Sequence, residues 1–238
     1  MTIEMNNTVA GTTRITPLPL AAGLALIFDL DGVIVDSMPV HRLSWERYLE
    51  TIGASTLNVV ERMHGRRNDE IFRDFLGDGP SDEEIFEHGA AKERLFREMI
   101  AESLQDHLVP GVVQFLERAK GVPVALASNA ERPNVDFVLD RANLRQYFRV
   151  IVDGSQVERP KPAPDVYLRA AQELGVAPAN CIVFEDSEVG VTAARAAGTR
   201  VAGILTQMEQ LEGVEFSAAD FRANELMEWL ARQAPAGF

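Results

Sequence analysis

The sequence predicts an α/β protein with a doubly wound, mostly parallel sheet. Short apolar runs alternate along the chain with segments of helical periodicity, which is the pattern of successive βα units. The runs contain few polar residues, as expected for strands that helices cover on both faces. Of the 238 residues, 46% are hydrophobic and 25% are charged, the proportions of an ordinary globular protein with a sizeable core.

Five apolar runs are expected to form the strands of this sheet. The first of them leads directly into an acidic loop, Asp29-Leu30-Asp31-Gly32. A strand that ends in a polar loop is typical of the edge at which an α/β sheet binds its ligand. The five runs are residues 24–28, 122–127, 150–152, 182–184 and 200–204.

Amphipathic segments between these runs are expected to form the connecting helices. Pro133 marks the start of one, because proline fits the first turn of a helix. Gly175 and Gly198 mark the ends of two others, since a glycine commonly follows the last helical residue. The apolar positions that define the segments are Val112–Leu116, Val135–Leu139, Val166–Leu174 and Val189–Ala197.

The stretch between the first two predicted strands is too long for a single crossover helix. About 90 residues separate Phe28 from Val122, whereas a complete βαβ unit needs about 30. The stretch contains no β-branched run, and Ser81–Glu84 matches a capping box that would open a helix running towards Ile100. We therefore expect a helical subdomain inserted after the first strand.

These patterns divide the chain into three parts. Residues 1–23 are expected to be a disordered leader, because they lack the basic and apolar regions of a signal peptide. Residues 24–39 and 109–238 are expected to form the core domain. Residues 40–108 are expected to form a helical cap, and this name is kept for them below.

Charge and composition limit the partners of the protein. The net charge of −13 argues against nucleic acid and anionic membranes, which would repel the surface, but a local pocket can still bind a small phosphorylated metabolite. No run approaches the roughly 18 apolar residues that cross a membrane. The single cysteine, Cys181, excludes an internal disulfide and a cysteine metal cluster. We expect a cytoplasmic monomer.

The most informative residues are Asp29 and Asp31, at the expected end of the first strand. Two carboxylates separated by one residue can take different roles, one as nucleophile and metal ligand and the other as proton donor and acceptor. Further polar residues follow the later strands and should reach the same edge of the sheet. They are Ser128, Asn129, Lys161, Glu185 and Asp186.

Together these groups predict phosphoryl transfer. Oxygen ligands without histidine or cysteine suit Mg²⁺. The ion and Lys161 could neutralise a phosphoryl group while Ser128 donates to its oxygens, and a carboxylate nucleophile would form an aspartyl-phosphate. Taken alone, each motif also fits a turn, a helix N-cap or a solvated side chain. Their occurrence at successive strand ends favours the catalytic interpretation.

The motifs resemble those of the haloacid dehalogenase superfamily, in the branch of β-phosphoglucomutase and small-metabolite phosphatases with a helical cap. The resemblance covers about residues 24–204 and implies a Rossmann-like core and a Mg²⁺-dependent enzyme. Dehalogenase activity is disfavoured, because those enzymes do not use a second aspartate at the position of Asp31. The matching residues are Phe28–Ser37, Ser128–Asn129, Lys161–Asp165 and Phe184–Ser187 with Gly190.

The resemblance also implies a role for each core residue. Asp29 would attack phosphorus. Asp31 would protonate the leaving oxygen and later activate water, and its main-chain carbonyl would bind Mg²⁺. The phosphoryl oxygens would be held by Ser128, Asn129 and Lys161, and the metal by Asp29, Asp31, Glu185 and Asp186.

In the cap, three residues match positions of β-phosphoglucomutase. His41 follows the proposed nucleophile by the same spacing as the mutase's cap-entry histidine, and Trp45 matches four residues later. Lys92 falls where the mutase has a cap lysine. A structural role as exposed helical residues is an equally open interpretation of His41 and Lys92.

Two departures from the mutase favour a hydrolase. Asn68 stands where the mutase's cap arginine grips a distal phosphate, and Ala130 and Glu131 replace a serine and a lysine. Losing these groups should weaken binding of a bisphosphate intermediate. The sequence therefore predicts a phosphatase for a small phosphorylated metabolite such as a sugar phosphate. A phosphomutase is the alternative, because Arg66 or Arg67 could replace the cap arginine after a one-residue shift.

Two other classes of protein are less compatible with the sequence. A phospho-accepting signalling domain also uses an acidic cluster and Mg²⁺, but it has no reason to carry a helical insertion over the site. A non-catalytic scaffold on an enzyme fold would not need all of the motifs intact.

Overall fold

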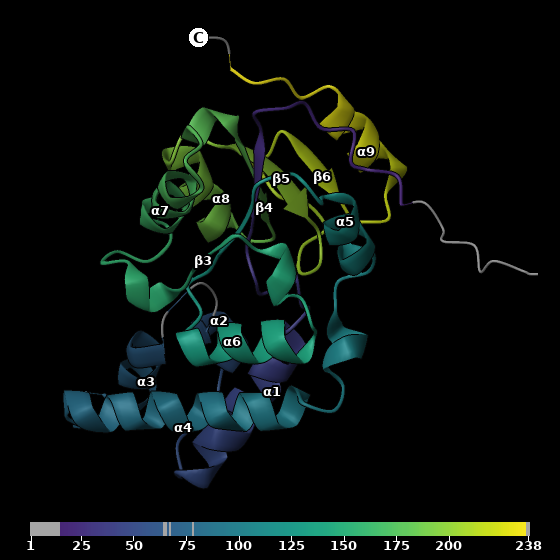
Figure 1. Ribbon diagram of the computed structural model, residues 1–238. Coiled ribbons are helices and arrows are strands. Elements are labelled where there is room, and N and C mark those ends of the chain that lie inside the picture. The colour runs from purple at the N-terminus through teal and green to yellow at the C-terminus, as the bar shows by residue number, and fades with distance from the viewer. Residues whose placement is uncertain (1–14, 64–65, 67, 78, 237–238) are drawn as a thin grey trace, which may run out of the picture.

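A computed structural model describes residues 15–63, 66, 68–77 and 79–236. Within these ranges, parallel strands form a 6-stranded sheet in the order β3-β2-β1-β4-β5-β6 (Figure 1). The doubly wound α/β prediction is confirmed, and each expected strand is present. Their bounds are β1 (Ala25–Phe28), β2 (Val124–Ala127), β3 (Val150–Val152), β4 (Cys181–Glu185) and β5 (Arg200–Ile204).

The sixth strand, β6 (Phe216–Ala218), was not predicted from the sequence. It lies at the edge of the sheet, paired with β5 alone among the described strands. Phe216 is half-buried, Ser217 is exposed, and Ala218 is buried. Its sequence therefore lacks the apolar run by which the five other strands could be recognised.

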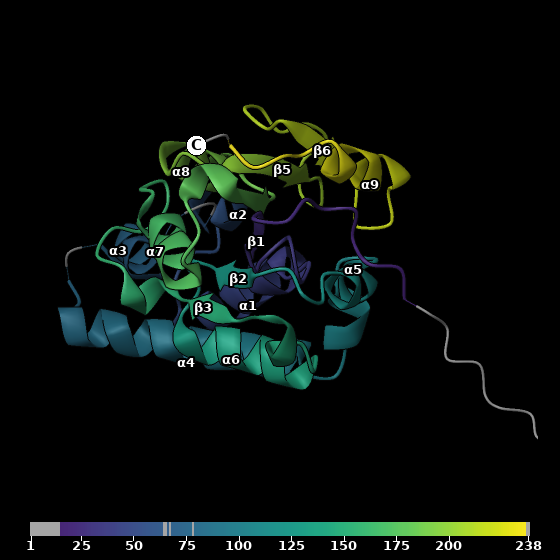
Figure 2. The same cartoon turned by 45° about the horizontal axis from the view of Figure 1, so that its top comes forward.

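Helices cover both faces of the sheet, as the doubly wound prediction requires. Leu26 and Phe28 of β1 belong to the hydrophobic cluster under α5, α6 and α9, whereas Ala25 and Ile27 belong to the cluster under α7 and α8. Figures 1 and 2 show α5 and α9 on the opposite side of the strands from α7 and α8. The helices are α5 (Val112–Arg118), α6 (Arg132–Arg141), α7 (Asp165–Leu174), α8 (Glu188–Ala196) and α9 (Asn224–Ala231).

Within the part of the cap that the structure describes, four α-helices follow β1 and share a hydrophobic cluster of their own around Trp45, Phe72 and Ile85. The predicted capping box is present, since the Ser81 hydroxyl accepts from the Glu84 amide at 3.3 Å and the Glu84 carboxylate accepts from the Ser81 amide at 2.8 Å. Figure 1 shows the cap helices below the sheet, with α4 beside α6. They are α1 (Met38–Thr51), α2 (Val59–Met63), α3 (Asn68–Leu76) and α4 (Asp82–Ile100).

Short 3₁₀ helices complete the connections. Among the helices of the described ranges, none is long and apolar enough to span a membrane. The 3₁₀ helices are η1 (Leu104–His107), η2 (Arg145–Tyr147), η3 (Gly154–Gln156) and η4 (Pro178–Asn180).

The later part of the expected leader packs against the core. Leu18 is buried, and its amide donates to the carbonyl of Arg118 at the end of α5 at 3.0 Å. The guanidinium of Arg118 in turn donates to the carbonyl of Thr16. Residues 1–14 lie outside the described residues.

The register of the sheet places the strand ends next to one another. Phe28 of β1 lies beside Leu126 of β2 on one side and beside Phe184 of β4 on the other. Because all three strands run in the same direction, Asp29 and Glu185 emerge at one edge, and Ser128 emerges close by.

Candidate active site

A pocket of about 800 Å³ lies between the carboxyl edge of the sheet and the cap. Both parts of the chain contribute to its wall, from the strand ends on one side and from α1, α3 and α4 on the other. Arg67, which was also predicted as a site residue, lies outside the described residues. The predicted site residues in the wall are Asp29, Asp31, His41, Trp45, Arg66, Asn68, Lys92, Ser128, Asn129, Lys161, Glu185 and Asp186.

Lys161 lies at the centre of the acidic residues. Its Nζ atom is 2.7 Å from Oδ1 of Asp29 and 2.7 Å from Oε1 of Glu185, and all three side chains are buried. Burial raises the pKa of Asp29 to about 7, although the Lys161 ammonium opposes this shift. Burial would lower the pKa of Lys161, but the two carboxylates outweigh it and raise that pKa above its usual value. The lysine therefore stays charged beside Asp29.

Glu185 holds Lys161 and the loop after β4 in place. Its Oε1 atom accepts from Lys161 and from the Tyr167 hydroxyl, and its Oε2 atom accepts from the amides of Asp186 and Ser187 and from the Ser187 hydroxyl. Burial would raise the pKa of Glu185, but Lys161 and Tyr167 lower it. A Cβ atom at Gly190 would lie 1.7 Å from Glu185 Oε1, so this carboxylate needs a glycine there.

Asp186 lies against the loop that follows β1. A Cβ atom at Gly32 would lie 1.8 Å from Oδ2 of Asp186, and Gly32 has a φ of +80°, which also favours glycine. Burial, together with the carboxylates of Glu185 and Asp29, raises the pKa of Asp186 well above its usual value. The charge of Lys161 lowers this pKa but does not outweigh burial and the two carboxylates.

These acidic residues fit a hard divalent cation. Ligand oxygens of Asp29, Glu185 and Asp186 lie within 4.8 Å of one another, and all three residues are buried. Burial and mutual repulsion raise the pKa values of Asp29 and Asp186, which a bound cation would relieve. An all-oxygen donor set suits Mg²⁺. Since Glu185 already accepts from protein donors at both oxygens, Asp29 and Asp186 are better placed as direct ligands.

A chain of polar contacts leads from the cap to Asp31. The Ser37 hydroxyl donates to Oδ1 of Asp31 at 2.5 Å, and Nε2 of His41 lies 3.7 Å from the same oxygen. Lys92 Nζ lies 3.0 Å from Nδ1 of His41. An ammonium group can only donate, so Nδ1 accepts and the ring proton sits on Nε2, facing Asp31. Burial would raise the pKa of Asp31, but His41 and Ser37 lower it.

Ser128 and Asn129 have different surroundings. The Ser128 hydroxyl accepts from the amide of Ala130 at 3.0 Å, which leaves its own hydrogen available to a ligand in the pocket. The side-chain carbonyl of Asn129 accepts from the amide of Lys161 at 3.0 Å. Asn129 thus positions the loop of Lys161, a contact that the sequence did not indicate.

Among the predicted cap residues, Lys92 and Asn68 contact Glu93, whereas Arg66 contacts Asp74. Lys92 is buried, pairs with Glu93 at 2.8 Å and lies 4.8 Å from the centre of the Trp45 ring. Asn68 donates to Glu93 at 2.9 Å. Arg66 lines the pocket but is exposed, and its Nη1 atom donates to Oδ2 of Asp74 at 3.1 Å.

The structure adds residues that sequence reasoning missed. Tyr167 donates to Glu185 of the predicted metal site, Ser37 donates to Asp31, and Glu93 and Asn134 join the cap to α6. Ser37 stands inside the first motif and could have been noticed there. Tyr167 lies at a helical core position, where its spacing does not distinguish it from ordinary packing residues.

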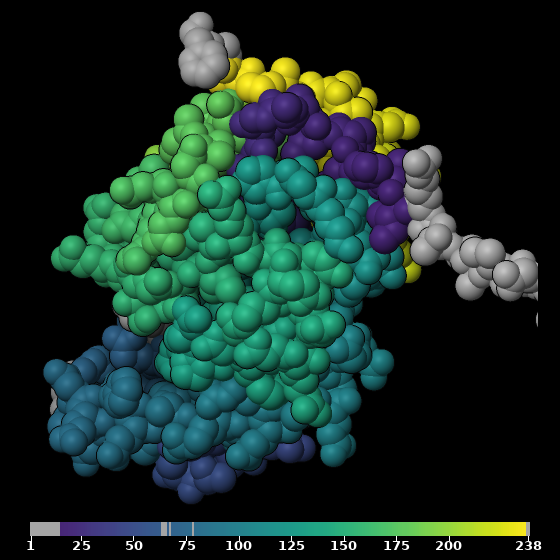
Figure 3. All heavy atoms as spheres, in the orientation of Figure 1, coloured from purple at the N-terminus to yellow at the C-terminus, as the bar shows by residue number. Residues whose placement is uncertain are grey.

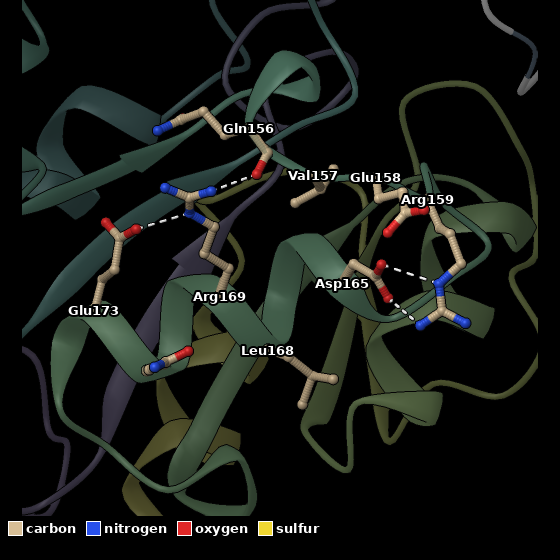
Figure 4. Close-up of a pocket in the computed structure, with 9 residues that line it drawn as sticks. Gln156, Val157, Glu158, Arg159, Asp165, Leu168, Arg169 and Glu173 are labelled. Atoms are coloured by element: carbon tan, nitrogen blue, oxygen red, sulfur yellow. Dashed lines mark hydrogen bonds and ion pairs between the residues drawn. The ribbon is translucent and has the colours of Figure 1, made fainter.

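A second hollow lies on the core, between η3 and α7 (Figure 4). Its two arginines are already paired, Arg159 with Asp165 at 2.7 Å and Arg169 with Glu173 at 2.8 Å. The predicted site residues line the other pocket, so this hollow is not the candidate site.

Comparison with known proteins agrees with this geometry. A family model described as a haloacid dehalogenase-like hydrolase matches residues 24–198. The chain is 41% identical to protein CbbY of Rhodobacter capsulatus, covering 85% of this chain and 93% of that one. It is 33% identical to the fructose-1-phosphate phosphatase YqaB of Escherichia coli, covering 73% and 92%. It is 31% identical to β-phosphoglucomutase of Bacillus subtilis, covering 76% and 82%.

Solved structures show the same fold. A haloacid dehalogenase hydrolase of Entamoeba histolytica matches with a TM-score of 0.78 and 28% identity, covering 88% of this chain and 100% of that one. CbbY of Rhodobacter sphaeroides, crystallised in complex with xylulose-(1,5)bisphosphate, matches with a TM-score of 0.73 and 27% identity, covering 83% and 94%.

Proposed function

The chain belongs to the haloacid dehalogenase-like hydrolases, an enzyme family whose members related to it include phosphatases and a phosphomutase, and from this premise we propose that it is a Mg²⁺-dependent phosphatase. Its substrate would be a small phosphorylated metabolite such as a sugar phosphate, hydrolysed through an aspartyl-phosphate. The observation that carries the proposal is the position of Lys161, 2.7 Å from Asp29, in the wall of the pocket.

In this proposal Asp29 is the nucleophile. One of its oxygens attacks phosphorus and forms a new P–O bond, while the P–O bond to the leaving alcohol breaks. Lys161 balances negative charge on the carboxylate and on the phosphoryl oxygens, because it is held charged at the same place. Ser128 donates its free hydroxyl hydrogen to a phosphoryl oxygen.

Asp31 transfers the protons. It gives a proton to the leaving oxygen, and afterwards it takes a proton from the water that attacks phosphorus. As that water adds, the P–O bond to Asp29 breaks, which frees the Asp29 carboxylate and inorganic phosphate. Ser37 and His41 hold its carboxylate and lower its pKa. The negative charge of an arriving phosphate monoester raises that pKa again, which favours the protonated form when the acid is needed.

Mg²⁺ would be held by the side chains of Asp29 and Asp186 and by the main-chain carbonyl of Asp31. Once bound, it would supply positive charge next to the phosphoryl oxygens. Glu185 keeps Lys161 and the main chain of Asp186 in position through its hydrogen bonds.

A β-phosphoglucomutase-like phosphomutase is the alternative. The observation in its favour is that His41 and Lys92, which match mutase positions, lie in the pocket and contact each other. Against it, Asn68 and Glu131 occupy the positions of two phosphate-gripping residues, and Arg66 is engaged by Asp74.

Phosphorus NMR separates the two reactions. We would incubate the protein with β-glucose 1-phosphate, Mg²⁺ and a trace of glucose 1,6-bisphosphate. Growth of inorganic phosphate supports the phosphatase, whereas growth of glucose 6-phosphate without inorganic phosphate supports the mutase. The Asp29→Asn variant should be inactive in either case. If neither signal grows, fructose 1-phosphate and p-nitrophenyl phosphate are tested next, and no phosphate release from any of the three contradicts the proposal.

A further inference from the structure

The positive charges in the wall of the pocket are already paired with carboxylates. Among the described lysines and arginines that line it, each has an acidic partner within 4.0 Å. Arg73, for instance, pairs with Asp82. The other pairs are Arg66 with Asp74, Lys92 with Glu93, Arg132 with Asp136, and Lys161 with Asp29 and Glu185.

Glu131 differs from these acidic residues. It lines the pocket at the start of α6, and within the described ranges no lysine or arginine lies within 4.0 Å of its carboxylate. The amide of Asn68, on the opposite cap helix α3, donates to Oε1 of Glu131 at 3.2 Å and to Oε1 of Glu93 at 2.9 Å. The amide hydrogens of Asn68 are thus directed at two carboxylates, and its carbonyl oxygen points elsewhere.

This part of the wall therefore offers acceptors. Oε2 of Glu131 and the side-chain carbonyl of Asn68 have no donor among the described residues. Neither atom can donate a hydrogen bond when the carboxyl group is ionised. A ligand that fits here must bring its own donors.

The surroundings of Glu131 also disfavour added negative charge. Burial, and then the carboxylate of Glu93, raises the pKa of Glu131. The hydrogen bond from Asn68 and the charges of Lys92 and Arg97 oppose this shift but do not cancel it. Lys92 is paired with Glu93, and Nη1 of Arg97 donates to Asn134 at 2.6 Å. A second anion beside Glu131 would meet the same repulsion.

We propose that Glu131 and Asn68 form a distal subsite that binds hydroxyl groups of the substrate and discriminates against a second phosphate. The substrate class is then a monophosphate ester of an uncharged, polyhydroxylated carbon chain, a sugar or a polyol. This inference rests on the proposed phosphatase function and specifies the substrate of that site.

Hydrogen-bond chemistry explains the selectivity. A hydroxyl group has a hydrogen to donate to Glu131 or to the carbonyl of Asn68. A phosphate dianion has acceptor oxygens only, so it would lose hydration without gaining a donor, and it would face the charge of Glu131. A site built to hydrogen-bond a hydroxyl rejects an analogue that cannot donate.

The proposal distinguishes this chain from one of its relatives. CbbY of Rhodobacter sphaeroides was crystallised with xylulose-(1,5)bisphosphate, which carries a phosphate at each end. We expect this chain to prefer the singly phosphorylated ketose.

The experiment compares fructose 1-phosphate with fructose 1,6-bisphosphate. Release of inorganic phosphate gives kcat and KM for each, and we expect kcat/KM to be at least about tenfold higher for the monophosphate. Glu131→Gln should reduce the ratio of kcat/KM for the monophosphate to kcat/KM for the bisphosphate severalfold. Glu131→Lys should reduce this ratio further or bring it below one, mainly because KM for the bisphosphate falls. Glu228→Gln, the same substitution on the exposed face of α9, should leave both substrates unchanged.

Two results would overturn the inference. One is a wild-type preference for the bisphosphate, and the other is a ratio that stays the same in both Glu131 variants. Calorimetry on the Asp29→Asn protein measures the Kd of each of the two sugar phosphates without turnover, so the preference for the monophosphate can also be tested as a ratio of Kd values. Loss of the proposed function, seen as no phosphate release from any monoester, is therefore distinguishable from failure of this inference.

Discussion

The side-chain amide of Asn134, on core helix α6, donates to the Glu93 carboxylate, on cap helix α4, at 2.6 Å. Both residues are buried, and the carbonyl of the same amide accepts from Arg97 of α4 at 2.6 Å. Both the nitrogen and the oxygen of the Asn134 side-chain amide are thus hydrogen-bonded to residues of the cap. Figure 3 shows the α6 segment lying against the cap on this face. The position of the cap over the pocket depends on polar contacts as well as on apolar packing.

Replacing Asn134 should weaken the contact between core helix α6 and cap helix α4, which is called the α4–α6 junction below. Asn134→Ala removes the hydrogen bonds to Glu93 and Arg97, and we expect a loss of about 1–3 kcal/mol in the free energy of unfolding, measured with urea. KM should rise as well, because the cap contributes to the pocket wall. Gln172→Ala, an exposed amide on α7, is the control. If the free energy of unfolding of Asn134→Ala equals that of this control, the α4–α6 junction is held by other contacts.

Glu93 should make stability depend on pH in the acid range. Burial would raise its pKa, but Lys92, His41 and the hydrogen bond from Asn134 lower it from 4.5 to about 2. A carboxyl with a lowered pKa stabilises the folded state above about pH 4.5, and this contribution is lost as the pH falls from there towards 2. The amount is on the order of 1–3 kcal/mol.

Urea unfolding at pH 6 and pH 3.5 tests this dependence. Glu93→Gln should lose less stability between the two pH values than the wild type, although it starts from a lower value. Glu98→Gln, exposed on the same helix, should follow the wild type. Equal losses in the Glu93 and Glu98 variants would contradict the assignment.

Tyr167 should be needed for the arrangement of Glu185. Its buried hydroxyl donates to Oε1 of Glu185 at 2.6 Å. Tyr167→Phe removes a hydrogen bond to a charged group, which should lower the free energy of unfolding by about 1.5–3 kcal/mol and reduce kcat. Tyr147→Phe is the matched control, because its hydroxyl lies 3.5 Å from Glu117 at the limit of hydrogen bonding. Identical stability of the two variants would rule out a strong Tyr167–Glu185 bond.

Ser128 should contribute through its hydroxyl. Ser128→Ala removes the donor proposed for a phosphoryl oxygen, and we expect kcat/KM for a phosphate monoester to fall about 5- to 30-fold, equivalent to about 1–2 kcal/mol. Ser128→Thr keeps a hydroxyl and should retain more activity. Ser217→Ala, exposed in β6, should behave as the wild type. Full activity of Ser128→Ala would exclude this contact.

Mg²⁺ should stabilise the folded protein. Binding to the folded state alone raises the free energy of unfolding by about 2.7 kcal/mol when the ion exceeds its Kd 100-fold, so the melting temperature should rise by several degrees. Chelation should reverse the shift, and Asp186→Asn should abolish it. Asp106→Asn, at an exposed residue of η1, is the control. A shift of the same size in Asp186→Asn would place the ion elsewhere.

Some of the site follows from local sequence. Strands β1, β2 and β4 were predictable because each is an apolar run, and Asp29, Ser128 and Glu185 were predictable because they stand at or just beyond the ends of these runs. Parallel strands present their carboxyl ends at one edge, so these residues had to meet. The capping box at Ser81 was predictable for a similar reason, since it depends on neighbours within one turn.

Other features depend on which distant segments come together. Asn129 holds the main chain of Lys161, and Tyr167 shares Glu185 with it, although nothing in the spacing of these residues indicates a pairing. Periodicity fixes the face on which a side chain lies, but it does not fix which residue of another element that face will meet.

The sequence by itself determined the fold class, the order of most strands and helices along the chain, and the residue types at the strand ends, because these depend on short-range patterns of burial. The tertiary structure decided the partners of each charge. It paired Lys161 with Asp29 and Glu185, and it left Glu131 facing Asn68 across the pocket. Such pairings are set by distances of a few ångströms between segments far apart in the chain, which no local pattern encodes.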